Sequence, residues 1–312
     1  MSKIPTSPQK RATLISSSVA TLLLLVKLVL GVASGSVAVL ASAIDSLLDM
    51  LVSVFNFFAI KKSEEDPDDA YHYGKAKIQA IAAVIEGTVI TISGIYIIYE
   101  AIHKLREGAV TTLLTPSIIA MILSIGITYL LVKYLLKIAK ETDNIVIKAD
   151  ALHYQTDLWS NAAVLVALGL VFVTGIDAID ALFGFGIGIY IIYSAYEIIV
   201  EGINILLDRA LEEEMVQSIK EIIENHPEVT NYHWLKTRTD GTTNFVEFHM
   251  VLRPNMRLLE AHRIADQIED KIFLLDSNKR WIITPHFDPY DDEQMNTAML
   301  QGQHLPRAKK EA

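Results

Sequence analysis

Long apolar stretches are the feature that most restricts how this chain can fold. Six of them lie before residue 208, and each is long enough to cross a bilayer core, which takes roughly 20 residues. Hydrophobic residues make up 51% of the 312 residues, and the mean hydropathy of +0.33 is higher than in soluble domains. We therefore expect an α-helical membrane domain with six transmembrane helices, at about 13–33, 37–60, 78–101, 114–136, 145–173 and 178–207.

Ionisable side chains interrupt the second and fifth of these stretches. Asp45 and Asp49 form one pair and His153 and Asp157 the other, each at the i, i+4 spacing that places two side chains on one helix face. Such groups are costly at membrane depth and usually mark a functional site. Three carboxylates and one imidazole facing each other across two helices would form a four-coordinate site for a divalent metal. The simplest role of such a site within a membrane is transport.

The amino-acid composition limits which metals the chain can bind and which partners it can have. Cysteine is absent, so a metal must be held by His, Asp and Glu, which suit zinc, ferrous iron, manganese or cadmium better than cuprous copper. The formal net charge of -10 argues against a nucleic-acid partner. The chain contains no HExxH motif and no evident nucleophile–base pair, so we do not expect an enzyme.

Lysine and arginine predict the orientation in the membrane. They gather before the first stretch, between the second and third, and after the fourth, and cytoplasmic loops carry such an excess. Both termini of this multi-pass protein are therefore expected in the cytoplasm. The N-terminal segment has no evident cleavage site and is interpreted as the lead-in to a retained helix. The basic residues concerned are Lys3, Lys10, Arg11, Lys61, Lys62, Lys75, Lys77, Lys133, Lys137 and Lys140.

The sequence changes character after Asp208. An amphipathic helix, two strand-like runs joined by a turn at 241–243, a helix at about 258–273 and a third strand predict an α-β-β-α-β domain with both helices on one sheet face. The expected domains are therefore a membrane domain over 1–208, a cytosolic domain over 209–290, and a tail over 291–312 that is polar and without periodicity, hence disordered.

The combined motifs resemble the cation diffusion facilitator family, in its bacterial zinc and ferrous-iron efflux branch. They are SAIDSLLDM in the second span, HYQTD in the fifth, and FVEFHM with HFDP in the tail. The resemblance runs from about Arg11 to Asp288. It implies a homodimeric divalent-metal/proton antiporter with a ferredoxin-like or metallochaperone-like cytosolic domain. It also implies that the transport site consists of Asp45, Asp49, His153 and Asp157, the set that the spacing argument reaches independently.

Two further sites follow from the resemblance alone. The first is a cytosolic metal site near the dimer interface, formed by His233, His249, His262, His286 and Asp288. The second is a loop site that departs from the family pattern, because Tyr71 and Lys75 occupy its two usual histidine positions and only Asp68 matches. We expect this loop site to be absent or much weakened.

The expected function is the export of zinc, with ferrous iron and cadmium as further substrates, in exchange for protons. Zinc would be the substrate at the membrane site and a regulatory ligand at the cytosolic site. Carboxylates and imidazole must lose protons to bind a metal, so metal and proton loading exclude each other. The alternatives are a manganese- or iron-specific exporter and a membrane metal sensor without flux. The lack of a His-rich loop between the fourth and fifth spans favours a bacterial plasma (inner) membrane.

Overall fold

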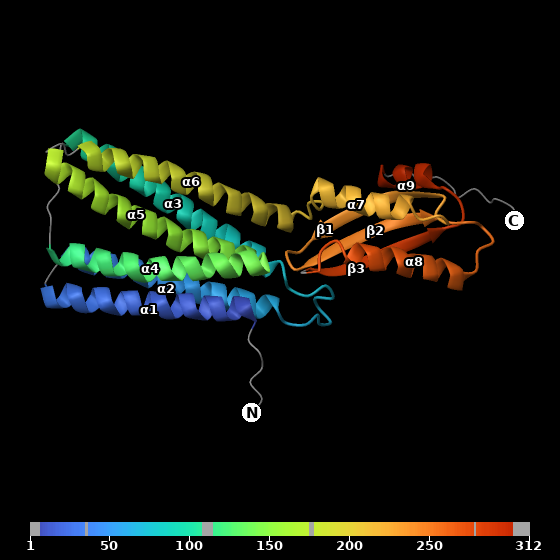
Figure 1. The fold of residues 1–312 in the computed structure, drawn as a ribbon, viewed down its shortest axis with the longest axis horizontal. Helices are drawn as coiled ribbons and strands as arrows, with labels where there is room; N and C mark the ends of the chain where they lie inside the picture. The colour runs from blue at the N-terminus through green and yellow to red at the C-terminus, as the bar shows by residue number, and fades with distance from the viewer. Residues whose placement is uncertain (1–6, 35–36, 108–114, 175–177, 278, 302–312) are drawn as a thin grey trace, which may run out of the picture. The chain divides into compact units, whose positions relative to one another are not determined.

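The computed structural model describes residues 7–34, 37–107, 115–174, 178–277 and 279–301 (Figure 1). The chain divides into two compact units, Met1–Leu206 and Leu207–Ala312. Helices alone make up the first unit, and a three-stranded sheet with helices makes up the second.

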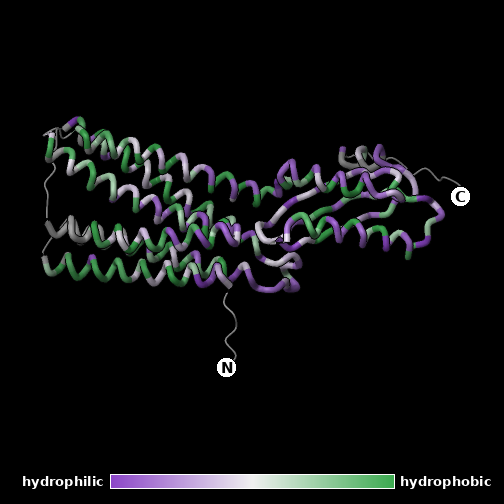
Figure 2. Tube along the Cα trace, in the orientation of Figure 1, coloured by the Kyte–Doolittle hydropathy of each residue, from purple (hydrophilic) through white to green (hydrophobic). Residues whose placement is uncertain are grey.

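The first unit contains six long helices. In the described part of the chain, four stretches are long and apolar enough to cross a membrane: Pro8–Leu30, Ile78–His103, Met121–Thr142 and Ala181–Leu206. Figure 2 shows the extended hydrophobic colouring of these helices. The two helices with the ionisable pairs, α2 and α5, have 27 and 30 residues, and their role as spans, and hence the total of six, stays a prediction. The helices are α1 (Pro8–Ser34), α2 (Val37–Ser63), α3 (Ile78–Glu107), α4 (Thr115–Thr142), α5 (Ile145–Thr174) and α6 (Ala178–Leu206).

Glycines allow α3 and α6, which lie side by side, to pack closely (Figure 1). A Cβ atom added at Gly188 would lie 2.5 Å from Cγ1 of Ile98 and 2.9 Å from the carbonyl oxygen of Gly94. A Cβ atom at Gly94 would in turn lie 3.1 Å from the carbonyl oxygen of Gly188. Small residues at such a contact let two helix backbones approach each other, which is the usual basis of helix association in membranes.

A buried apolar core joins α1, α2, α4 and α5. Its largest members include Ile60 near the end of α2, Leu135 of α4, and Ile147 and Tyr154 in the first turns of α5, and all four are essentially inaccessible. This packing holds the C-terminal half of α2 against the N-terminal half of α5. Asp49 of α2 is thereby brought face to face with His153 and Asp157 of α5.

The second unit follows the predicted α-β-β-α-β order. Strands β1 (Asn231–Thr239) and β2 (Thr243–Val251) form an antiparallel hairpin, and β3 (Arg280–Asp288) pairs with β2 in parallel. The helices α7 (Glu213–Glu224) and α8 (Leu258–Phe273) both pack on the sheet face that carries Val246, Phe248 and Met250. Strand side chains alternate between faces, so His249 belongs to the opposite face. The prediction that both helices lie on one face is confirmed.

The segment after β3 differs from the prediction of a disordered tail. Helix α9 (Glu293–Leu300) lies there and contacts β1. Asp291 starts this helix, because its Oδ1 accepts a hydrogen bond from the backbone N–H of Glu293 at 3.0 Å. Its other oxygen accepts one from Nδ2 of Asn231 at 2.8 Å. The local sequence is polar and does not indicate these contacts to a distant strand, so it predicts disorder where the structure has α9. Residues 302–312 of the predicted tail lie outside the described residues.

Candidate metal sites

Helices α2 and α5 bring Asp49, His153 and Asp157 together. Nε2 of His153 lies 3.1 Å from Oδ1 of Asp49 and 3.9 Å from Oδ2 of Asp157. Bonds to zinc are about 2.0–2.2 Å long, so two ligand atoms on one ion lie within about 4.4 Å of each other. Both measured separations meet this limit, and one ligand atom from each of the three residues lies within 4.8 Å of the others. The three side chains can therefore hold a divalent ion after little movement.

The fourth predicted ligand at this site is Asp45. The helix α2 passes through position 45, but the Asp45 side chain lies outside the described residues. One helical turn separates it from Asp49, so the backbone places both on the same face of α2. Asp45 accordingly stays a predicted ligand.

The surroundings of His153 orient its ring towards the two aspartates. The ring packs edge-on against Tyr154, with centroids 5.4 Å apart, and the hydroxyl groups of Tyr154 and Ser53 lie 2.8 Å from each other. The side chain of His153 is only 11% exposed, whereas that of Asp157 is 39% exposed. A buried imidazole beside accessible carboxylates can exchange protons for a metal ion, because each ligand must be deprotonated to coordinate.

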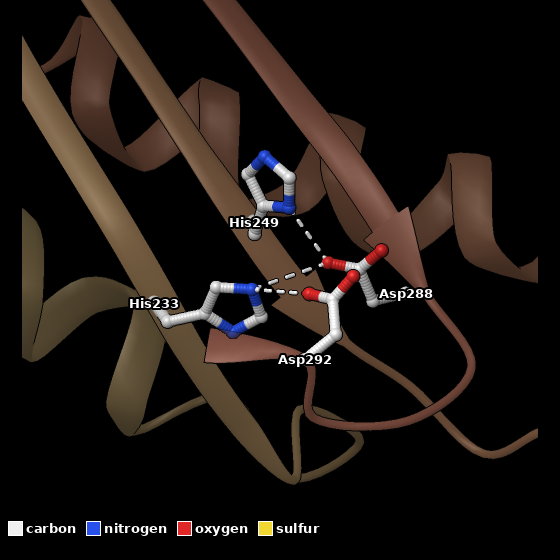
Figure 3. Close-up of side chains that lie close together, drawn as sticks. All are labelled: His233, His249, Asp288 and Asp292. Atoms are coloured by element: carbon white, nitrogen blue, oxygen red, sulfur yellow. Dashed lines mark hydrogen bonds and ion pairs between the residues drawn. The ribbon is translucent and has the colours of Figure 1, made fainter. Parts of the chain in front are cut away.

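A second group of metal-capable side chains lies in the cytosolic unit (Figure 3). It consists of His233, His249, Asp288 and Asp292, with one ligand atom from each within 4.8 Å of the others. Oδ2 of Asp288 lies 2.7 Å from Nδ1 of His249 and 3.4 Å from Nε2 of His233. The same nitrogen of His233 lies 3.0 Å from Oδ1 of Asp292. Two imidazoles and two carboxylates form a suitable donor set for zinc.

The strand register explains why these residues meet. His233 of β1 lies opposite His249 of β2, and His249 lies opposite His286 of β3, so three histidines form one row across the sheet. A bulge follows His233 in β1, where Trp234 adopts a left-handed φ of 56°. A non-glycine residue in this region marks local strain, which is concentrated at functional sites. The Trp234 ring packs against His249, with centroids 5.1 Å apart.

The remaining predicted ligands of the cytosolic site are not in this tight group. The imidazole of His286 is 65% exposed, although its Nε2 lies 3.3 Å from Oδ1 of Asp288 and its ring stacks 4.5 Å from that of His249. His262 is 67% exposed on α8, where its nearest acidic partner is Asp266 at 3.8 Å. Since α8 packs on the face opposite the histidine row, His262 lies away from the group within one chain.

Asp292 is the residue that the sequence prediction missed. It lies only three residues after the HFDP motif, in the acidic run Asp291-Asp292-Glu293. Its closeness to that motif is the signal in the sequence that could have indicated a ligand, but the polar composition of the run predicts a disordered tail. Helix α9 anchors the run: the backbone N–H of Glu293, together with the Asn231 side chain, lowers the pKa of Asp291.

The loop between α2 and α3 offers no metal-binding group in its described residues. Nζ of Lys75 lies 2.6 Å from Oδ2 of Asp68, and this hydrogen-bonded ammonium lowers the pKa of the Asp68 carboxyl. The lysine also lies 5.0 Å from the centre of the Tyr71 ring. A fixed positive charge thus contacts the one acidic residue that matches the family pattern, and the absence or weakness of the loop site stays a prediction.

Comparison with known proteins agrees with this geometry. Residues 13–207 match the family described as cation efflux transmembrane domain, and residues 211–290 match the cation efflux protein, cytoplasmic domain. Cation-efflux pump FieF from Escherichia coli O1:K1 / APEC is 36% identical over 262 residues, covering 84% of this chain and 87% of the relative. The pumps of the same name from strains K12 / DH10B and O157:H7 (EC4115 / EHEC) match with the same 36% identity and coverage. Two family matches over most of the chain, together with paired metal-capable clusters, show that this chain belongs to the cation diffusion facilitator family of metal-cation efflux transporters.

Proposed function

We propose that this protein exports zinc from the bacterial cytosol in exchange for protons, with ferrous iron and cadmium as further substrates. It acts as a homodimer in the plasma (inner) membrane, with six spans and both termini in the cytoplasm. Asp45, Asp49, His153 and Asp157 form the transport site. The observation that carries the proposal is the close approach of His153 to Asp49 and Asp157 within helices of the membrane domain.

The donor set supports zinc as the substrate. One imidazole with carboxylates is a borderline ligand set that suits zinc, ferrous iron and cadmium, whereas an all-oxygen set suits harder ions such as manganese. Proton exchange follows from the same side chains, since metal binding displaces protons from them.

The cytosolic group serves regulation in this proposal. His233, His249, Asp288 and Asp292 come from three strands and the segment after them, so a bound ion would link these elements. Metal binding would then stabilise the cytosolic domain in proportion to the free metal concentration, by mass action. His286 lies at the edge of this group, and His262 stays a predicted ligand that is away from it in one chain.

Two alternatives differ from this proposal in measurable ways. A manganese- or iron-specific exporter would transport those ions in preference to zinc. A membrane metal sensor would bind metal at the cytosolic domain without any flux. The cluster of His153 with Asp49 and Asp157 favours a transporter over a sensor, because a sensor has no use for ionisable groups at membrane depth.

Flux measurements on the purified, reconstituted protein test the proposal. Zinc entry into vesicles under an imposed pH gradient is expected for the wild type and is expected to be abolished by Asp157→Ala, since removal of one ligand leaves an incomplete site. Gel filtration and thermal unfolding of the variant check that it still folds. Wild-type vesicles without zinc flux would favour the sensor, and normal flux in Asp157→Ala would refute the site.

A further inference from the structure

Three fully buried polar side chains lie close to the candidate transport site but are not among its ligands. They are Asn56 of α2, Glu86 of α3 and Asp150 of α5, each at most 1% exposed. We name them the inner acid cluster. Asn56 follows Asp49 by seven residues and Asp150 precedes His153 by three, offsets of about 10 Å and about 4.5 Å along the helices at 1.5 Å per residue.

The contacts within the inner acid cluster link three helices. Nδ2 of Asn56 donates a hydrogen bond to Oε2 of Glu86 at 2.9 Å. The carboxylate of Asp150 accepts one from Oγ of Ser53 at 3.5 Å, and the side chains of Ser16 and Asn56 also contact it. Asp150 therefore has several hydrogen-bond donors, whereas Asn56 is the one donor to Glu86 among the residues that the structure describes.

The inner acid cluster has more hydrogen-bond acceptors than donors. Oδ1 of Asn56, Oε1 of Glu86 and Oδ2 of Asp150 are all buried and have no hydrogen-bond partner within the described part of the chain. When both acids are ionised, all three atoms are acceptors, and no donor is left for any of them. Buried polar atoms normally find a partner, and each exception requires an explanation. A proton on one carboxyl group turns an acceptor into a donor and supplies the missing hydrogen bond.

The nearby carboxylate of Asp150 also favours a proton on Glu86, whereas a protonated His153 opposes it. The charged or titratable groups that act on it are Asp150 and His153, both from α5. Helix α2 presents Asn56, and α6 presents Ile199, which lies next to Gly87 of α3. No basic side chain of the described residues is among the contacts of Glu86 or Asp150. Two buried carboxylates with no Lys or Arg partner among the described residues, and with only His153 nearby as a titratable base, are disfavoured unless one of them is neutral.

We propose that Glu86 is a proton-carrying residue of the transport cycle, separate from the metal ligands. It holds a proton, directed at the oxygens of Asn56 or Asp150, while the transport site is free of metal. Binding of a divalent cation at Asp49, His153 and Asp157 adds positive charge nearby, stabilises the Glu86 carboxylate and releases the proton. This inference rests on the proposed exchange of metal for protons and adds a second location for the protons.

The experiment compares proton and zinc movement in the same vesicles. The full-length protein is reconstituted with a pH indicator and a zinc indicator inside, and the ratio of protons to zinc is measured for wild type, Glu86→Gln and Glu197→Gln. Glu86→Gln keeps the shape and supplies an N–H donor to the cluster. It is expected to transport zinc with a lower ratio, by about one proton per zinc ion. Glu197 is an exposed acid of α6, so its variant controls for the loss of a carboxyl group and is expected to keep the wild-type ratio.

Each other result overturns the inference in a defined way. An unchanged ratio in Glu86→Gln means that Glu86 carries no transported proton. Loss of zinc flux in a folded Glu86→Gln protein assigns Glu86 to metal binding instead. Absence of zinc flux in the wild type contradicts the proposed function, which is a separate failure.

Infrared difference spectroscopy on the wild type gives a second test that does not depend on the folding of any variant. Addition of zinc to the detergent-solubilised protein at neutral pH is expected to remove a band of protonated carboxyl. If no such band is lost, Glu86 does not release a proton on metal binding, and the inference is wrong. The measurement needs no flux, so it also separates this inference from the proposed antiport.

Discussion

Asp288 is the residue on which the geometry of the cytosolic metal group depends. Its carboxylate lies within 3.4 Å of imidazole nitrogens from His233, His249 and His286. The side chain is only 9% exposed, so water replaces it poorly. Asp288→Asn keeps the size of the side chain but removes its charge, which both weakens a ligand and replaces one of the two acceptor oxygens that orient the histidines.

The expected loss follows from the number of ligands. Four-ligand structural zinc sites contribute about 10–16 kcal/mol at pH 7, so one ligand of four is worth roughly 3–4 kcal/mol. That corresponds to an affinity loss of roughly 100- to 1,000-fold. Because the amide oxygen of asparagine keeps some capacity as a ligand, we expect the lower end of this range.

Zinc competition titration measures this loss. The full-length protein carries Asp157→Ala in every sample, so that only the cytosolic site is observed. Asp270→Asn, on the exposed part of α8, is the matched control and is expected to keep the affinity of the parent. Equal affinity of Asp288→Asn and the parent would show that Asp288 is not a ligand. Absence of micromolar zinc binding by the parent would refute the cytosolic site as a whole.

Three further predictions address pH, packing and the hairpin. Zinc affinity at the membrane site is expected to fall as the pH falls, because protons compete with the metal for His153 and the neighbouring carboxylates. Zinc titrations of Asp288→Asn protein at several pH values check this, and a flat profile would contradict proton competition. Gly188→Ala is expected to lower the free energy of unfolding by about 1–3 kcal/mol, because the added methyl group overpacks α3 against α6. Thermal unfolding measures this loss, and Gly186→Ala is the control because nothing lies within 4 Å of its added Cβ. Burial and the hydrogen bond to Glu224 raise the pKa of Tyr232 to about 12. The protonated phenol therefore stabilises the fold at any pH below the pKa of tyrosine in the unfolded chain, about 10, and this contribution is lost as the pH rises from about 10 to 12. Tyr232→Phe is expected to abolish this part of the pH dependence of the free energy of unfolding.

Local periodicity in the sequence was enough to predict several features of this protein. Four carboxylate and imidazole positions at i, i+4 spacing in apolar stretches predict the membrane site, because helix geometry alone places such pairs on one face, and three of the four come together in the structure. Alternating strands and a turn at 241–243 likewise predicted the hairpin that carries His233 and His249. The motifs around these residues pointed to the family to which the chain belongs.

Contacts between residues that are far apart in the sequence could be learned from the tertiary structure alone. Asp292 joins the cytosolic group because α9 and Asn231 anchor its segment beside β1. Asn56 connects Glu86 with Asp150 because three helices pack together. His262 matches the family pattern equally well in sequence, yet it lies on the outer surface of α8. The physical reason is common to these cases. A local pattern gives the face on which a side chain lies, but contacts between faces depend on strand register, bulges and helix packing, and these are properties of the whole fold.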